Sequence, residues 1–445
     1  MLNLFKTNEM RVFSKELMDE ACRQCNVIRP GQATIMDNAK LSAYLESTTG
    51  IPVIHMELGS PGFSPNRVGA QAEIDALNAG VGSKYPPTDG LPVLKEASSR
   101  FVKAFLNIDL APKYHIPTTG SMLGAFGAFA AAGQCRPGRS KILVLEPSFS
   151  ANKQQFAILG LPWKGVEAAD LRAEGFEDGL RRELSGGEYA AVVYSNPNNP
   201  SWMCLSEDEV AAVARVAGES DTIVIEDLAY FCMDTRGGFG TPYHEPYPPT
   251  VARYTDNYMM LLSASKIFSY AGQRIGVLCV GEGLYNRVFP ALAARYGGTG
   301  IFGLTITGGI LDMLTSGCTA STQWGLAAMM NSSCEGELNF VEEISGYGTR
   351  AARMKAIFLR NGFSISYESD GRGPIADGFF FTLSYPGMDS ATLVDELIAY
   401  GVSTVSLDKM GSSRHGVRVC SSRIEGGQFP LLEERMAAFA QDHCQ

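Results

Sequence analysis

Five runs of almost unbroken apolar residues alternate with helix-like segments through the middle of the chain. The runs are KILVLEP (141–147), AAVVYSN (190–196), TIVIED (222–227), NYMMLLS (257–263) and IGVLCVG (275–281). Strands that are apolar at nearly every position are buried on both faces, which is typical of a mainly parallel sheet covered by helices. Between two of them, SEDEVAAVARVAGES has the pattern of a helix that begins after Ser206 with acidic residues in its first turn. The pattern predicts a large α/β domain over residues 66–325.

The two ends of the chain follow a different pattern. Residues 1 to about 50 have a helical and polar pattern without strong capping signals. After residue 325, ELNFVEEISGYGTRAARMKAIFLRNGF predicts one long helix ending at Asn361–Gly362. Strand-like DGFFFTLSYP, a helix from Ser390 and strand-like GVRVCSSRI follow it. We therefore expect a smaller α+β domain over residues 326–445, with an N-terminal segment, residues 1–65, contributing to it.

Composition and charge narrow the functional class. The chain has 445 residues, of which 45% are hydrophobic and 19% charged, values typical of soluble globular proteins. A net charge of -10 argues against nucleic acid as a partner, because that partner requires a basic face. No apolar run approaches the ~20 residues needed to span a bilayer, and the first residues lack the features of a secretory signal. We expect a cytoplasmic protein that binds neither nucleic acid nor membrane.

The cysteines and histidines do not predict a metal site. Ten scattered cysteines in a chain of this size are typical of reduced thiols rather than of a disulfide framework. Cys22 and Cys25 form a CxxC pair that stands alone in a helix-like segment, which favours packing over zinc or redox chemistry. The five histidines show no ligand spacing, so we expect no metal.

Polar residues gather where the predicted strands end. The segments EPSFS, SNPNNP, EDLAY and SASK each follow one of the apolar runs. In open α/β sheets the ligand binds outside the carboxyl ends of the strands, so these segments are expected to line one crevice.

Each candidate residue in these segments has two interpretations. Lys266 is compatible with a Schiff-base lysine, which needs a partly desolvated amine, or with an ordinary loop lysine. The Asp227 carboxylate either faces the crevice or caps the next segment, and Asn199 is a site amide or a turn residue. The segment TTGSMLGAFGAFAAAG either offers free N–H groups to a phosphate or uses its small residues for tight packing.

Together these groups match the requirements of pyridoxal phosphate. A carboxylate keeps the pyridine nitrogen protonated, so that the ring can act as an electron sink. An amide and a phenol near the ring oxygen tune the lysine adduct, and an aromatic side chain stacks on the ring. A helix N-terminus, hydroxyls and an arginine bind the phosphate.

The motifs resemble those of the class I/II aminotransferases, pyridoxal-phosphate enzymes of fold type I similar to aspartate aminotransferase. SASKIFSYAGQRIG resembles the family's lysine signature, which implies that a loop presents Lys266 to the cofactor while Ser263 and Arg274 bind its phosphate. SNPNNPSW implies Asn199 at the ring oxygen and near the substrate, although Ser201 and Trp202 replace the family's Thr-Gly.

Further motifs of the resemblance imply the rest of the site. IEDLAY implies Asp227 at the pyridine nitrogen and Tyr230 at the ring oxygen, with Leu228 replacing the usual acid. The resemblance implies phosphate contacts from Gly120, Ser121 and Met122, and a phosphate contact in a neighbouring subunit from Tyr85. It implies that Phe149 stacks on the ring. It also implies that Gly59 lies near the substrate and that Arg418 binds the substrate α-carboxylate, with Arg423 the weaker candidate.

The resemblance implies an aminotransferase that acts as a homodimer on an L-amino acid and a 2-keto acid. The implied mechanism is ping-pong through a Schiff base of Lys266, which then serves as the general base. A fold-type-I lyase or synthase, of the β-elimination type, is the nearest alternative, because fold does not fix the reaction. A non-catalytic sensor that keeps the cofactor site is a more remote one. The substrate stays open: Arg67 or Arg295 would suit a distal carboxylate, whereas the aromatic residues would suit an apolar donor.

Overall fold

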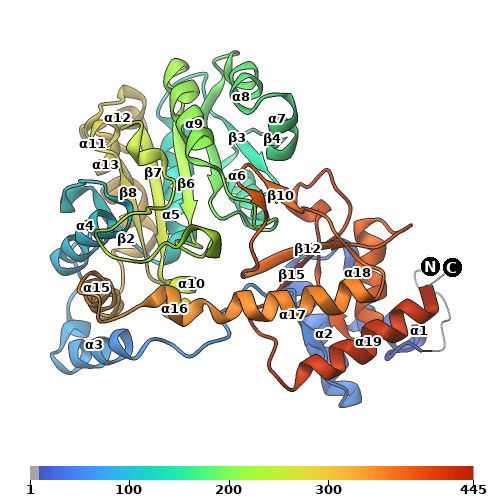
Figure 1. Cartoon of the computed structure of the whole chain (residues 1–445). Helices are drawn as coiled ribbons and strands as arrows, with labels where there is room; N and C mark the ends of the chain where they lie inside the picture. The colour runs from blue at the N-terminus through green and yellow to red at the C-terminus, as the bar shows by residue number, and fades with distance from the viewer. Residues whose placement is uncertain (1–9, 444–445) are drawn as a thin grey trace.

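A seven-stranded sheet forms the centre of the large part of the molecule, residues 66–345 (Figure 1). The computed structural model describes residues 10–443. The strands lie in the order β2 (His115–Thr118), β8 (Gly276–Val280), β7 (Tyr258–Ser263), β6 (Ile223–Leu228), β5 (Tyr189–Ser195), β3 (Lys141–Glu146) and β4 (Trp163–Glu167). β8 runs antiparallel to both of its neighbours, and every other pair is parallel. The predicted mainly parallel sheet is confirmed.

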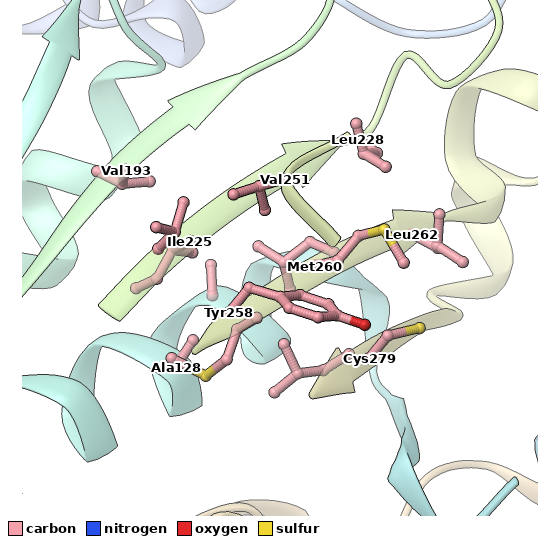
Figure 2. Packing of buried hydrophobic residues seen from close by; sticks show 14 of the residues in the cluster. Ala128, Val193, Ile225, Leu228, Val251, Tyr258, Met260, Leu262 and Cys279 are labelled. Atoms are coloured by element: carbon pink, nitrogen blue, oxygen red, sulfur yellow. The ribbon is translucent and has the colours of Figure 1, made fainter. Parts of the chain in front are cut away.

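Helices cover the sheet because its strands are apolar on both faces. Every residue of β7 and β8 is buried. Figure 2 shows this packing, with Ala128 of α5 below the sheet and Val193, Ile225 and Met260 on neighbouring strands. The helices of this part are α3 (Arg67–Asn78), α4 (Pro92–Leu106), α5 (Gly120–Gln134), α6 (Ser150–Leu159), α7 (Ala168–Glu174), α8 (Phe176–Leu184), α9 (Glu207–Glu219), α10 (Ala264–Ile267), α11 (Glu282–Asn286), α12 (Pro290–Tyr296), α13 (Phe302–Leu304), a π-helix (Thr305–Leu311), α14 (Asp312–Thr315), α15 (Ala320–Cys334) and α16 (Phe340–Ile344).

The small part of the molecule combines residues 10–65 with residues 346–443. Its antiparallel sheet has the order β14 (Val405–Ser406), β15 (Val417–Cys420), β12 (Phe380–Ser384) and β9 (Ser364–Ile365). Its other elements are α1 (Lys15–Cys25), α2 (Ile35–Thr49), β1 (Ile54–His55), α17 (Gly346–Arg360), β10 (Ser369–Asp370), β11 (Gly373–Pro374), α18 (Ser390–Ala399), β13 (Val402–Ser403) and α19 (Gln428–His443). β1 pairs in parallel with β13, so the N-terminal segment joins the C-terminal one.

The boundary predicted at residue 325 falls inside α15. That helix packs against α3 and α4, and its buried residues belong to the core of the large part. Figure 1 shows α17 running from the large part to the small part. We therefore propose that the two domains divide near Ser345 rather than at residue 325.

The prediction that the N-terminal helices lack strong caps is wrong. The Ser14 side chain accepts a hydrogen bond from the Leu17 N–H, and Thr34 forms a reciprocal capping box with Asp37 at the start of α2. Cys22 and Cys25 are both buried in the cluster between α1 and α2, as the packing interpretation predicts. Among residues 10–443, no group of three or more potential metal-binding side chains is found.

The single long helix predicted after residue 337 is divided in two. Asn339 caps α16 through a hydrogen bond from the Glu342 N–H, and the Ser345 N–H bonds back only three residues to the Glu342 carbonyl. Two glycines follow at 346 and 348, and glycine is a weak helix former, so the chain tightens between α16 and α17. In the part of the chain that the structure describes, no helix has the length and apolarity needed to cross a bilayer.

Candidate functional site

Lys266 lies in α10, a helix of one turn that directly follows β7. The sequence predicted a loop here, and that prediction is wrong. Ser263, the last residue of β7, caps the turn: its Oγ accepts a hydrogen bond from the Ser265 N–H at 3.2 Å. The cap fixes the backbone of the turn and therefore the direction in which Lys266 leaves it.

The Lys266 ammonium contacts two residues of the small part of the molecule. Nζ donates a hydrogen bond to the Gly59 carbonyl and lies 5.6 Å from the centre of the Phe379 ring. Burial lowers the pKa of Lys266 to about 8, because the charged form loses its hydration. The amine therefore has a substantial neutral fraction near physiological pH.

Asp227 is the penultimate residue of strand β6 and pairs with Leu261 of β7. Its Oδ1 accepts a hydrogen bond from the Ala229 N–H at 3.0 Å. Burial raises the pKa of Asp227 to about 6, and that hydrogen bond opposes the shift. Within residues 10–443 we find no salt bridge to this carboxylate, so its preference for a cation is left unmet by the protein.

Tyr230 lies beside this carboxylate in an aromatic wall. Its ring is 5.4 Å from that of Trp202 and 5.3 Å from that of Phe380, both edge-to-face. Burial raises the pKa of Tyr230, so the phenol keeps its proton at neutral pH. The wall excludes water from this side of the crevice.

Arg418 of β15 is 1% exposed and has unused hydrogen-bonding capacity. Nη1 donates to the Asn199 Oδ1 at 3.2 Å, and Nη2 donates to the Glu57 carbonyl. The guanidinium lies 4.5 Å from the centre of the Phe380 ring, while its Nε is buried without a partner. The described chain places no carboxylate in salt-bridge contact with it, and burial lowers the pKa of Arg418. A buried guanidinium of this kind suits an anionic ligand.

The N-terminus of α5 and Arg274 lie together, and the Arg274 charge is close enough to Lys266 to lower the pKa of that amine. Gly120 begins α5 with a φ of +70°, and a Cβ at this position would clash with the Arg274 guanidinium. Arg274 is exposed, with its Nη1 bonded to the Ala271 carbonyl at 2.9 Å. The N–H groups of Ser121 and Met122 follow in the first turn, where the helix dipole favours an anion.

Phe149 and Tyr85 occupy contrasting positions. Phe149 is partly buried and precedes α6, just beyond the end of β3. Tyr85 is 88% exposed. Its phenol is thus available to another molecule rather than packed in its own chain.

Three further arginines considered from the sequence are all exposed. Arg67 begins α3, Arg295 lies in α12, and Arg423 follows β15. Arg423 therefore differs from Arg418, which is buried in the crevice.

Sequence reasoning did not identify several residues of the site. Glu57 supplies a carbonyl to Arg418, and Phe379 and Phe380 contact the two cationic side chains. A buried acid in MELGSPGF and the aromatic run GFFF were the available signals. Trp202 was noted only as a departure, yet its indole packs against Tyr230.

A cavity of about 360 Å³ lies outside this arrangement. It is lined by residues 232–235 and 238–241, by α16 and by the start of α17, and its lining includes Tyr347 and Gly378. None of the candidate residues lines it, so we do not assign the chemistry of the crevice to this cavity.

Residues 52–366 match the family model described as "Aminotransferase class I and II". The chain is 28% identical over 261 residues to the aspartate/prephenate aminotransferase of Thermus thermophilus, covering 58% of this chain and 63% of that protein. It is 29% identical over 256 residues to a probable N-succinyldiaminopimelate aminotransferase of Mycobacterium tuberculosis, covering 57% and 60%. The aligned part thus spans about three fifths of the length of these curated relatives.

Solved structures share the fold over nearly the whole chain. The aspartate aminotransferase of Thermus thermophilus with maleate has a TM-score of 0.71 and 20% identity, covering 94% of this chain and 98% of that one. The alanine aminotransferase of Pyrococcus furiosus has a TM-score of 0.69 and 19% identity, covering 92% and 96%. At this identity the likeness shows the fold.

Proposed function

The chain belongs to the class I and II aminotransferases, and from this premise we propose that it transfers an amino group between an L-amino acid and a 2-keto acid. The observation that carries the proposal is the convergence of Lys266, Asp227 and Arg418 at one end of the sheet, where Arg418 is buried, Lys266 and Asp227 are partly buried, and each has capacity left for a ligand. Such groups are costly to bury without a partner, so their accumulation in one crevice indicates a ligand site.

The residues present fit pyridoxal phosphate. We assign Lys266 to its covalent attachment, Asp227 to the pyridine N–H, and Asn199 and Tyr230 to the ring oxygen. Phe149 is assigned to the ring face, and the phosphate to Gly120, Ser121, Met122, Ser263 and Arg274. The close approach of Arg274 to Gly120 supports this phosphate site, because an anion there would meet both a guanidinium and a helix N-terminus. The Ser263 Oγ already caps α10, so we assign its phosphate contact to the hydroxyl proton.

The bound cofactor supplies a conjugated ring that spreads the negative charge arising at the substrate α-carbon. Arg418 binds and orients the α-carboxylate, which fixes the α-carbon relative to Lys266. Lys266, with its lowered pKa, takes the α-proton and returns a proton in the same half-reaction. Gly59 holds Nζ near the substrate, and Asp227 stays ionised above its pKa of about 6 to retain the proton on the ring nitrogen.

The proposed reaction has two half-reactions that use the same residues. In the first, an amino acid leaves as a keto acid and its amino group stays with the enzyme. In the second, another keto acid takes up that group. Arg418 serves both because each substrate carries an α-carboxylate.

We also propose that the enzyme acts as a homodimer. Tyr85 and a set of exposed apolar side chains lie on elements that pack together, since α3 contacts α15 and a Cβ at Gly317 would meet Pro86. The set comprises Ile74 (51% exposed), Leu77 (52%), Met313 (70%), Leu314 (51%) and Trp324 (41%). Exposed apolar groups gathered in this way are typical of an interface between chains. In such a dimer Tyr85 would reach the phosphate site of the partner.

The decisive experiment is the visible absorption spectrum of the purified protein with added pyridoxal phosphate and a panel of amino acids. We expect a band that is absent in Lys266→Ala, that one amino acid converts, and that a keto acid restores. Accumulation of pyruvate or ammonia with a persistent band would instead identify a lyase. Protein that binds no cofactor would show that Lys266 is an ordinary lysine.

A further inference from the structure

His55 lies between two carboxylates, in the segment that leads to Gly59. Its Nδ1 is 2.7 Å from the Glu57 Oε1, and its Nε2 is 3.3 Å from the Glu46 Oε2 of α2. Glu57 is fully buried, and its second oxygen, Oε2, has no hydrogen-bond partner among the described residues. His55 is therefore the group that balances the charge of this buried carboxylate.

The same segment forms part of the substrate site. The Glu57 backbone carbonyl accepts a hydrogen bond from Arg418, and two residues later the Gly59 carbonyl accepts one from Lys266. The charge of Glu57 also acts on Arg418 directly, since it raises the pKa of that guanidinium against the larger effect of burial. A change in the charge of His55 therefore acts on Glu57, which contacts Arg418, the group that would bind the substrate.

Charged groups from α2, α19, β15 and α10 surround the His55–Glu57 pair. Glu46 of α2 faces the outer nitrogen of His55, and Arg435 of α19 donates to the carbonyls of Pro52 and Gly401. On the crevice side the charged groups are Arg418 of β15 and Lys266 of α10. The β13 partners of β1 are uncharged. Among these groups, His55 is the one whose ordinary pKa lies closest to neutrality.

We propose that His55 and Glu57 are positioning residues that set the affinity of Arg418 for the substrate carboxylate. With His55 protonated, the pair is neutral and the whole charge of Arg418 is available to the substrate. When His55 loses its proton, the buried Glu57 carboxylate is left unbalanced beside Arg418 and competes with the incoming anion. The inference rests on the proposed role of Arg418.

The direction of the pH effect follows from this arrangement. Both carboxylates raise the pKa of His55, with the hydrogen bond to Glu57 as the largest contribution. The raised pKa therefore increases the fraction of the protein in the protonated, high-affinity form near neutral pH. Affinity for a carboxylate falls as the pH rises through this raised pKa.

The test uses the enzyme with pyridoxal phosphate bound and propionate, a carboxylate without a titratable amine. Its inhibition constant is measured from pH 6 to pH 9. We expect affinity in the wild-type protein to fall about tenfold over this range, a typical size for coupling between two sites. His55→Gln keeps a donor but cannot become charged, so it should bind weakly at every pH. Glu57→Gln removes the competing charge and should bind tightly at every pH.

These opposite signs distinguish the inference from a purely structural role, which would weaken binding in both variants. His415→Gln is the control. His415 also lies near a carboxylate, with its Nδ1 4.0 Å from an oxygen of Asp408, but its side chain is 68% exposed. It should reproduce the wild-type profile. A wild-type profile in His55→Gln, or weaker binding in Glu57→Gln, would overturn the proposal.

A second measurement uses the wild-type protein, so it does not depend on a variant that folds correctly. By reciprocal linkage, saturating propionate should raise the pKa of the His55 imidazole by about one unit in an NMR titration. An unchanged pKa would reject the inference. Arg418→Lys separates the two hypotheses: if propionate still binds as in the wild type, the proposed role of Arg418 fails. If that variant loses affinity while His55→Gln and Glu57→Gln match the wild type, only the present inference fails.

Discussion

At the scale of single residues, the environment of Lys266 predicts how fast the protein captures its cofactor. Only the neutral amine attacks an aldehyde, and burial lowers the pKa of Lys266 to about 8. The capture rate should therefore rise about tenfold per pH unit below pH 8 and level off above it. The measurement is the growth of the visible band after pyridoxal phosphate is added to cofactor-free protein, from pH 6 to pH 10.

The control for this profile is Lys266→Ala, in which only exposed lysines can react. Their neutral fraction keeps rising to a pH of about 10.4, so any residual reaction should follow that curve. A wild-type rate that also rises to pH 10 would mean that the ammonium is not desolvated in the free protein.

Motifs predicted the residues that leave the ends of strands, and they missed those that depend on register. Lys266 and Asn199 each follow an apolar run and Asp227 ends one, so their meeting at one end of the sheet follows from its parallel strands. Phe380 faces Arg418 only because β12 and β15 pair across some forty residues of chain, with Phe380 opposite Cys420. No local pattern encodes that register.

At the scale of elements, the start of α5 offers a test of the phosphate site. Gly120→Ala introduces a Cβ at a φ of +70° and displaces the Arg274 guanidinium. Since Arg274 is exposed, its side chain has room to move aside and the fold should survive. The affinity for pyridoxal phosphate should fall about tenfold, the loss expected for one weakened charge-assisted contact. Equilibrium titration of the cofactor measures this.

Gly138→Ala is the matched control for Gly120→Ala. Gly138 has a φ of +77°, and a Cβ there would contact nothing within 4 Å. The two variants share the backbone strain of a left-handed alanine, roughly 1 kcal/mol, but only one of them disturbs Arg274. Equal losses of cofactor affinity in both would contradict the assignment of this helix start.

Strand β6 carries a second carboxylate, Glu226, which precedes Asp227 and points to the opposite face of the sheet. Glu226 is fully buried and accepts hydrogen bonds from Tyr194 at 3.0 Å and Thr250 at 2.6 Å. Burial nevertheless raises its pKa to about 7. The native state therefore binds a proton that the unfolded state has already released between about pH 4.5 and pH 7.

It follows that Glu226 makes the free energy of unfolding fall as the pH rises through this window, with a slope of up to about 1.4 kcal/mol per pH unit. Glu226→Gln should remove that contribution while keeping a hydrogen-bonding side chain. Urea unfolding at several pH values measures the slopes. Identical slopes in the variant and the wild type would show that Glu226 does not titrate in this range.

Elements with strong periodic or apolar patterns were predicted well, and those fixed by caps or tertiary contacts were not. The five runs became β3, β5, β6, β7 and β8, and Ser206 begins α9 with a capping box. The cap of α2 was missed because Thr34 and Asp37 lie in a polar segment, where two more polar residues do not stand out as a capping motif. The α10 turn is too short for any periodicity, and it depends on the Ser263 side chain.

At the scale of the whole molecule, the sequence predicted two unequal parts, and we propose to move the boundary between them from residue 325 to near Ser345. The strands of the small sheet are two to five residues long, and β1 joins β13 across about 350 residues. Contacts of such sequence separation leave little local signal. The long α17 links the two parts, so the candidate crevice, which takes Lys266 from one and Arg418 from the other, depends on their relative placement (Figure 1).

The exposed apolar face predicts that assembly and cofactor binding are coupled. The wild-type protein should sediment as two chains of 47.9 kDa, and Met313→Glu combined with Leu314→Glu should convert it to a monomer. In the dimer both carboxylates would be buried without partners, and the free energy needed to desolvate them should exceed the free energy that the interface gains. The monomer should also bind pyridoxal phosphate more weakly, since it lacks the Tyr85 of a partner. Sedimentation velocity and cofactor titration measure the two effects.

Ile158→Glu provides the control for this double variant. Ile158 is 74% exposed on α6, which carries none of the apolar side chains proposed for the interface, so its charge should leave both assembly and cofactor affinity unchanged. Tyr85→Phe tests the link between the two properties, because it should weaken cofactor binding while leaving the dimer intact. A monomeric double variant with full activity would show that each crevice is complete within one chain. In that case the exposed face would have another purpose, and the carbonyls, guanidiniums and helix start of a single subunit would suffice to hold the cofactor.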